Sequence, residues 1–119
     1  MRIISWNCRG LGNPSKVEAV RDLMKAEPAD ILLLQETKIE GDTLLEISKN
    51  KWQKNSGKTV SARGTAGGIA TLWKEDQFKL VNTHNTQHWI FTELKHIASK
   101  LTIALFNLYV PVTYVDKKI

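Results

Sequence analysis

The arrangement of the chain follows from one stretch, Arg2-Ile3-Ile4-Ser5-Trp6-Asn7-Cys8-Arg9-Gly10. Its branched and aromatic residues are typical of a β-strand. The next residues, Gly10-Leu11-Gly12-Asn13-Pro14, are of the kinds that end a strand and form a turn. The sequence therefore predicts a short strand whose carboxyl end carries Asn7.

A second strand is predicted at Asp30-Ile31-Leu32-Leu33-Leu34-Gln35-Glu36, where an apolar run ends in a carboxylate. An ionisable group seldom ends a buried strand without a role. Between the two strands, Ser15-Lys16-Val17-Glu18 has the spacing of a capping box, which predicts a helix that begins here and ends before Pro28. Strand, helix and strand form a β-α-β unit with parallel strands. Parallel pairing would place Asn7 and Glu36 at the same edge of the sheet.

The remainder of the chain is predicted to be mainly β-structure. A second capping-box spacing, Thr43-Leu44-Leu45-Glu46, predicts a short helix to about Lys49, and the segment from Lys54 to Gly64 reads as a polar, basic loop. Four runs of β-type residues then predict an antiparallel meander with strands at 68–73, 78–81, 88–94 and 101–110. The last strand is apolar on both faces, which predicts a central position, and Pro111 ends it.

Composition indicates one soluble domain with a basic second half. The chain has 119 residues and a net charge of +5, and residues 51–119 carry ten Lys and Arg against four Asp and Glu. This balance suits a polyanionic partner such as nucleic acid, although many other proteins are as basic. Five residues, Lys51, Trp52, Lys54, Lys58 and Arg63, could grip a DNA backbone or could form a solvated loop.

The single cysteine, Cys8, gives information about the cellular location of the protein and about thiol reactivity. Cys8 has no partner for an internal disulfide, and no apolar run is long enough to span a bilayer. We therefore expect a nuclear or cytoplasmic protein without a membrane association. With no base predicted beside it, Cys8 reads as a buried structural thiol.

Three predicted strand ends offer an amide, a carboxylate and a phenol, from Asn7, Glu36 and Tyr109. Oxygen ligands of this kind suit Mg²⁺, which is commonly held by one or two carboxylates together with water and substrate phosphate. The alternative from spacing alone is structural. In that interpretation Asn7 caps a turn, Glu36 pairs with a nearby cation, and Tyr109 belongs to the core.

Four motifs resemble, in order and spacing, those of the endonuclease/exonuclease/phosphatase superfamily. They cover essentially the whole chain and run over Ile4–Gly12, Leu34–Lys38, Gly67–Trp73 and Asn107–Pro111. More narrowly, the chain is similar to the N-terminal part of a plant LINE-type (non-LTR) retrotransposon endonuclease. The Trp-Asn-Cys-Arg-Gly and Gln-Glu-Thr motifs at this separation are the specific part of the resemblance.

The resemblance implies an α/β fold, namely the N-terminal portion of a four-layer sandwich in which two packed β-sheets are flanked by helices. Residues 1–119 would then be a partial domain whose C-terminal half is missing. It also implies a hydrolase that nicks DNA with Mg²⁺ (or Mn²⁺). In that family the residues matching Asn7 and Glu36 shape and bind the metal site, and the residue matching Tyr109 contacts the phosphate.

The sequence departs from the family after Tyr109, because neither the Gly-Asp-Phe-Asn-like motif nor the Ser-Asp-His-like motif occurs. The three histidines, His84, His88 and His96, precede Tyr109 and are predicted to be surface or strand-edge residues. We therefore expect the fragment to be inactive alone, with an uncovered apolar face. Two alternatives stay open: another phosphoesterase of the superfamily, such as an exonuclease, an abasic-site enzyme or a small-molecule phosphatase, or a non-catalytic remnant that binds nucleic acid or protein.

Overall fold

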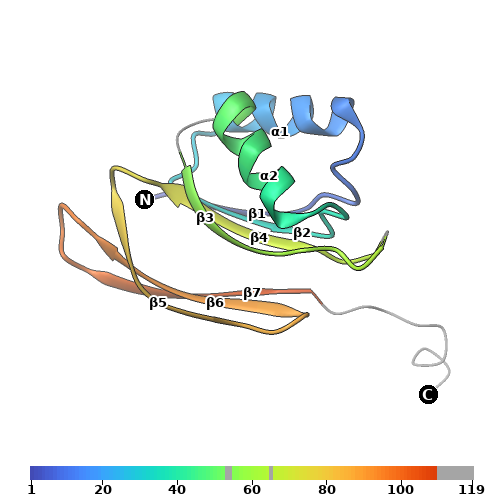
Figure 1. Cartoon of the computed structure of the whole chain (residues 1–119). Helices are drawn as coiled ribbons and strands as arrows, with labels where there is room; N and C mark the ends of the chain where they lie inside the picture. The colour runs from blue at the N-terminus through green and yellow to red at the C-terminus, as the bar shows by residue number, and fades with distance from the viewer. Residues whose placement is uncertain (53–54, 65, 110–119) are drawn as a thin grey trace, which may run out of the picture.

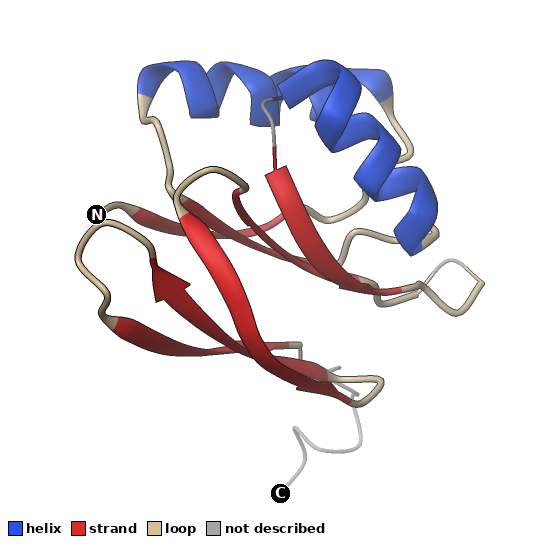
Figure 2. Cartoon of the chain, turned by 60° about the vertical axis from the view of Figure 1, so that its left-hand side comes forward, coloured by secondary structure: helices blue, strands red, loops and turns tan. Residues whose placement is uncertain are grey.

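The computed structural model describes residues 1–52, 55–64 and 66–109 and arranges them in three layers (Figure 1). Helices α1 (Pro14–Ala26) and α2 (Gly41–Ile47) cover one face of a four-stranded sheet. A three-stranded sheet lies on the opposite face, and Figure 2 shows the same order from a second direction. A π-helical turn, η1 (Ser48–Trp52), continues α2. In this described part of the chain, no helix is long and apolar enough to cross a membrane.

The first sheet contains the predicted β-α-β unit. Its strand order is β1-β2-β4-β3, and the strands are β1 (Ile3–Asn7), β2 (Ile31–Gln35), β3 (Asn55–Val60) and β4 (Ile69–Lys74). Strands β1 and β2 are parallel, with Asn7 paired to Gln35, while β4 is antiparallel to both β2 and β3. The parallel pairing is confirmed, and it brings the carboxyl ends of β1 and β2 to one edge.

Both predicted capping boxes are wrong. Helix α1 is capped by Asn13, whose side-chain oxygen accepts the backbone N–H of Ser15 at 2.9 Å, and Pro14 occupies the first turn. A proline suits this position because its missing N–H would be unpaired there anyway. Helix α2 begins after Glu40 without a side-chain cap, so Thr43 lies inside the helix.

The predicted meander holds for only three of its four strands. The second sheet consists of β5 (Phe78–Asn85), β6 (Trp89–His96) and β7 (Thr102–Leu108), which are antiparallel in that order. The remaining predicted strand, at 68–73, corresponds to β4, which pairs with the buried strand β2 and so joins the first sheet. Strand β3 lies within the segment predicted as a loop, because its backbone pairs with β4 in spite of its polar residues. The residues Lys54, Val110 and Pro111 fall outside the described ranges.

The prediction that the last strand is central is also wrong for the part of the chain that the structure describes, since β7 lies at the edge of its sheet. The apolar residues on the second face of β7 are exposed to solvent instead of being buried between neighbouring strands and a covering layer. Phe106 and Leu108 are 60% and 57% exposed, and Phe106 packs against Phe91 and Trp89 on the outer face of the sheet. The expected uncovered apolar face is therefore present in the structure.

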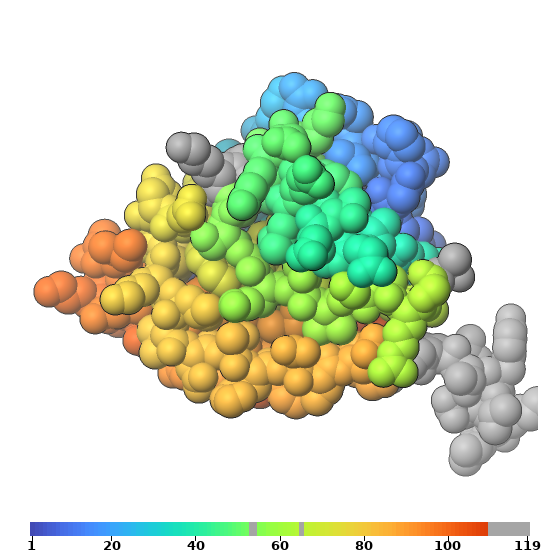
Figure 3. Space-filling view, in the orientation of Figure 1, coloured from blue at the N-terminus to red at the C-terminus, as the bar shows by residue number. Residues whose placement is uncertain are grey.

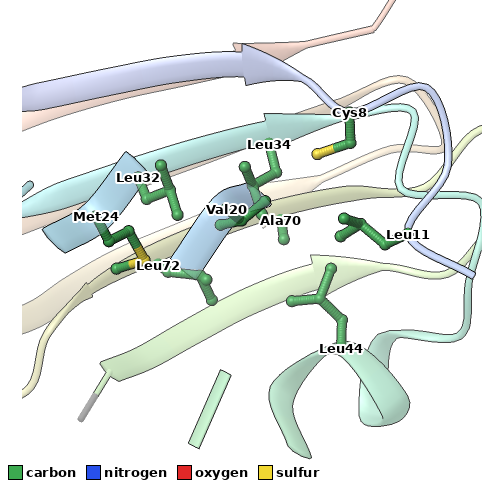
Figure 4. Close-up of a cluster of buried hydrophobic side chains, with 9 residues drawn as sticks. All are labelled: Cys8, Leu11, Val20, Met24, Leu32, Leu34, Leu44, Ala70 and Leu72. Carbon is green, nitrogen blue, oxygen red and sulfur yellow. The ribbon is translucent and has the colours of Figure 1, made fainter. Parts of the chain in front are cut away.

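The core explains why β2 is apolar throughout. Successive residues of a strand point to opposite faces, so Leu32 and Leu34 pack under the helices while Ile31 and Leu33 pack against the second sheet. Figure 4 shows the helix-side cluster, which contains Cys8, Leu11, Val20, Met24, Leu32, Leu34, Leu44, Ala70 and Leu72. In the space-filling view the second sheet lies directly against the first (Figure 3). The buried side chains of Ile31, Leu33, Trp73, Phe78 and Leu94 therefore hold the two sheets together.

Candidate functional site

Glu36 follows the last residue of β2 and lies beside the end of β1. The pairing of the two strands continues past their ends, because Cys8 N donates to Gln35 O at 2.9 Å and Gly10 N donates to Glu36 O at 2.8 Å. These bonds join the two predicted motifs along their length. Asn7 and Glu36 consequently occupy neighbouring positions at the same sheet edge, as the sequence predicts.

The backbone of Glu36 has a left-handed conformation, with φ of 52°. Such a conformation is unfavourable for a residue with a long side chain and persists only where its surroundings fix it. Here the following residues are bound to the loop before β4: Thr37 N donates to Gly68 O at 3.1 Å, and Lys38 N donates to Gly67 O at 2.8 Å. The fold thus holds Glu36 in a strained conformation, which is a feature typical of functional sites.

Tyr109 comes to Glu36 from the other sheet. Partial burial, the negative charge of Glu36 and a hydrogen bond to its carboxylate raise the pKa of Tyr109 above its ordinary value. The backbone of Tyr109 is fixed as well, because its N–H donates to His88 O at 2.8 Å. The phenol therefore remains protonated and serves as a hydrogen-bond donor at this edge.

The Asn7 side chain is engaged in a turn. Its carboxamide oxygen accepts the backbone N–H of Arg9 at 3.1 Å, and the side chain is exposed. Of the three predicted residues, Tyr109 lies close enough to Glu36 for the Glu36 carboxylate to raise the pKa of the phenol, and Asn7 stands beside them on the parallel strand. The turn fixes the direction of the Asn7 amide without removing it from solvent.

Sequence reasoning missed the part played by Asn107 and Gln35. Asn107 is 1% exposed, accepts the Gln35 amide at 2.8 Å, and donates to Ala70 O at 2.8 Å and Leu34 O at 3.3 Å. Gln35 also donates to Ser5 Oγ at 3.1 Å. This network ties the two sheets together close to the candidate site. Asn107, on the second sheet, lies two residues before Tyr109, and Gln35, on the first sheet, lies one residue before Glu36. The sequence contained one signal for this role: Asn107 is a polar residue on a strand face whose other residues, Leu101, Ile103 and Leu105, are apolar.

Positive charge surrounds the edge. Arg9 and Lys38 are exposed and follow Asn7 and Glu36 by two residues each. Lys16 Nζ donates to Cys8 O at 3.1 Å, which holds a third cation near the end of β1. An anionic group approaching Glu36 would therefore meet cations on both neighbouring loops.

Cys8 has the expected structural character. Burial raises the pKa of its thiol to about 12, Lys16 acts in the opposite direction, and Glu36 adds to the rise. The side chain is 2% exposed within the helix-side core. Because the thiolate is the reactive form, a thiol with this pKa is inert near neutral pH.

Two other predicted surface features have clear outcomes. His84 and His88 are exposed, and His96 is half-buried and bonded to Ser99, in agreement with the predicted surface or strand-edge positions. Trp52 is not part of a basic grip, because its indole N–H donates to Val17 O at 3.1 Å and its ring packs against the helix-side core.

The oxygen atoms of Glu36 and Asn7 suit a hard divalent cation whose remaining ligands are water and substrate. Within the described ranges, no group of three or more His, Cys, Asp or Glu side chains could enclose a metal ion. Mg²⁺ does not need such an enclosure, since it usually keeps several waters and is bound through one or two carboxylates plus substrate phosphate. The Glu36 carboxylate beside the Asn7 amide meets that requirement.

The strain at Glu36 predicts an unusual order of stability. We expect Glu36→Asn to be more stable than Glu36→Gln by about 0.5 to 1 kcal/mol, because asparagine adopts the left-handed conformation more readily than longer side chains do. Urea denaturation followed by tryptophan fluorescence would measure this difference. The same pair of substitutions at Glu46, in helix α2, should show the opposite order, because glutamine is the better helix former. An identical order at both positions would contradict the assignment of strain to Glu36.

Comparisons with known proteins agree with this fold. The model of the endonuclease/exonuclease/phosphatase family matches residues 4–112. The chain is similar to the AP endonuclease LMAP from Leishmania major, with a TM-score of 0.72 and 21% identity over 98% of this chain and 42% of that one. It is also similar to a humanized TDP2 from D. rerio, with a TM-score of 0.72 and 12% identity over 98% and 49% of the two chains.

A third solved structure, the 3'-5' exonuclease NExo from Neisseria meningitidis, has a TM-score of 0.61 and 21% identity over 92% of this chain and 41% of that one. No curated protein sequence matches the chain. At these identities the structural likeness shows the fold alone. The chain spans less than half the length of each of these three proteins.

Proposed function

This chain belongs to the endonuclease/exonuclease/phosphatase family, and on that premise we propose that it carries the metal-binding and phosphate-binding half of a site that cleaves phosphodiester bonds in DNA. The observation that carries the proposal is the pairing of Glu36 with Tyr109. These two residues come from different sheets, and one of them is held in a strained backbone conformation.

In this proposal each residue has a role set by its chemistry. The Glu36 carboxylate holds Mg²⁺ or Mn²⁺, and the Asn7 amide completes the polar edge beside it. The Tyr109 phenol, kept protonated by its raised pKa, donates a hydrogen bond to a phosphate oxygen. Arg9 and Lys38 attract the nucleic-acid backbone. A bound divalent ion supplies charge stabilisation at the phosphoryl oxygens.

Within the family, we place the chain with the endonucleases of plant LINE-type retrotransposons, which act on DNA in the nucleus. Support comes from the motifs Trp6-Asn7-Cys8-Arg9-Gly10 and Gln35-Glu36-Thr37. Two of the similar structures, an AP endonuclease and an exonuclease, have names that favour nucleic acid, while another is a mannosyl-6-phosphatase. We further propose that these 119 residues by themselves bind a phosphodiester without cleaving it, because they contain neither the Gly-Asp-Phe-Asn-like motif nor the Ser-Asp-His-like motif.

The test measures how the 119-residue chain binds a short DNA duplex, with and without Mg²⁺. We expect Mg²⁺ to strengthen binding, and Glu36→Gln to abolish that gain because the carboxylate that holds the ion is lost. Glu46→Gln removes the same charge from the exposed side of α2 and should leave the gain intact. Fluorescence anisotropy of a labelled duplex would report both results.

Two outcomes would contradict the proposal. Salt-dependent binding that is indifferent to Mg²⁺ and to Glu36 would favour the alternative of a non-catalytic binding remnant. Mg²⁺-dependent nicking of a supercoiled plasmid that is lost in Glu36→Gln would instead show that the chain cleaves DNA unaided.

A further inference from the structure

Gln35 is the last residue of β2 and lies directly before Glu36. Alternate residues of a strand share a face, so Gln35 belongs to the same face as Ile31 and Leu33, which pack against the second sheet. Its side chain is half-buried, and the metal and phosphate roles proposed above do not use it. Gln35 is therefore a polar residue at the point where the two sheets meet, next to the candidate site.

The Gln35 amide reaches two further strands. Its Nε2 atom donates to Asn107 Oδ1 in β7 at 2.8 Å and to Ser5 Oγ in β1 at 3.1 Å. An amide nitrogen carries two hydrogens, so both donors are used. Ser5 lies two residues before Asn7, and Asn107 lies two residues before Tyr109. One side chain thus joins the three strands that lead to the candidate site residues.

The direction of the bond between the two amides is fixed by Asn107. Its Nδ2 atom donates to Ala70 O at 2.8 Å and to Leu34 O at 3.3 Å. A reversed Asn107 amide would turn its oxygen toward these two carbonyl oxygens, which cannot donate. The Asn107 oxygen must therefore face Gln35, and Gln35 must present its nitrogen. A side chain of similar length without a donor could not take its place.

The two sheets would stay packed without the Gln35 amide. Asn107 would still donate to Leu34 O and Ala70 O, and the apolar cluster between the sheets does not include Gln35. The links that would be lost are the side-chain bonds from β2 to β1 and from β2 to β7, one residue before Glu36. Because Glu36 follows in a fixed left-handed conformation, a shift of Gln35 would move Glu36 with it.

We propose that Gln35 is a positioning residue that sets where Glu36 stands relative to Asn7 and Tyr109. The assignment rests on the proposed function, because these three residues are the ones proposed to hold the metal ion and the phosphate. Replacing a residue that orients a metal ligand through hydrogen bonds typically weakens metal binding by about 10- to 100-fold. Gln35 thus acts on affinity without contacting the ion or the phosphate.

The first measurement needs neither metal nor DNA. A double-mutant cycle with Glu36→Gln and Tyr109→Phe, followed by urea denaturation, gives the coupling between these two side chains. We expect Gln35→Met, which keeps the side-chain length but removes both donors, to abolish most of this coupling. Gln77→Met makes the same change in the turn between β4 and β5, at the opposite end of the first sheet, and should leave the coupling intact.

The second measurement uses the Mg²⁺-dependent gain in DNA binding. In Gln35→Met, the Mg²⁺ concentration at half-maximal gain should rise about tenfold. Ser5→Ala removes only the bond to β1 and should raise this concentration by a smaller factor, whereas Ser5→Thr keeps the hydroxyl and should retain the unmodified value. Ser5 is exposed, so both substitutions should leave stability nearly unchanged. A purely structural role would not change the Mg²⁺ dependence, and the Ser5 pair tests the positioning role even if Gln35→Met does not fold.

The positioning role and the proposed function can fail separately. An unmodified chain without coupling between Glu36 and Tyr109, a coupling that survives Gln35→Met, or equal losses in Gln35→Met and Gln77→Met would overturn the positioning role. If Gln35→Met abolishes the coupling while Mg²⁺ and Glu36→Gln leave DNA binding unchanged, the proposed function fails and the positioning role stands. If the Glu36-dependent gain is present and Gln35→Met and Ser5→Ala keep its Mg²⁺ dependence, the positioning role alone fails.

Discussion

Replacing Asn107 with leucine is expected to lower the free energy of unfolding by about 2 to 4 kcal/mol, although leucine has nearly the same shape. The amide of Asn107 is almost fully buried and bonds to Gln35, Leu34 O, Ala70 O and Thr71 Oγ1. Leucine would remove all of these hydrogen bonds, and a buried polar group that is left without a partner costs about 1 to 3 kcal/mol. Urea denaturation followed by tryptophan fluorescence would measure the loss.

The Asn107 substitution should also disturb the candidate site. Asn107 connects the strand before Tyr109 to the strand before Glu36, so its loss should weaken the Mg²⁺-dependent gain in DNA binding even at temperatures where the variant is folded. Asn85→Ala is a suitable control, because Asn85 is exposed in β5 and its change should stay within about 0.5 kcal/mol. A loss below about 1 kcal/mol for Asn107→Leu would show that the buried network does not hold the sheets together.

The sequence predicted the edge that carries the site because that edge depends on strong local signals. An apolar run ending in Glu36, a helix between two strands and the right-handed crossover leave little choice about where Asn7 and Glu36 lie. The family resemblance then supplied the packing of two sheets against each other. This is the part of the fold that the family match and the similar structures support.

The sequence did not predict features that depend on tertiary contacts. Strand β3 contains Asn55, Ser56, Gly57 and Lys58 and has no apolar pattern, so only its pairing with β4 reveals it. The cap of α1 was assigned to Ser15, whereas Asn13 caps the helix and Pro14 occupies its first turn, a position that suits proline. The role of Asn107 becomes visible only when the two sheets are packed together, since its partners lie far away in the sequence.

The second large effect is expected at Gly68, the residue that fixes the loop behind Glu36. Gly68 has φ of 90°, and a Cβ built there would lie 2.1 Å from Thr37 Oγ1 and 3.0 Å from Lys38 N. Thr37 is 1% exposed and cannot move aside easily. Gly68→Ala therefore combines backbone strain of about 1 to 2 kcal/mol with overpacking of about 1 to 3 kcal/mol, and we expect a total loss of about 2 to 5 kcal/mol in urea denaturation.

Two variants separate the strain at Gly68 from the clash. Gly64 also has a positive φ, 61°, but a Cβ there would meet nothing within 4 Å, so Gly64→Ala should show the strain alone, about 1 to 2 kcal/mol. Adding Thr37→Ala to Gly68→Ala removes the oxygen that clashes and should recover part of the loss, which a double-mutant cycle measures. Equal losses at Gly64 and Gly68 would mean that the loop behind Glu36 can relax. In that case the strained conformation of Glu36 would not be imposed by the contact between Thr37 and Gly68.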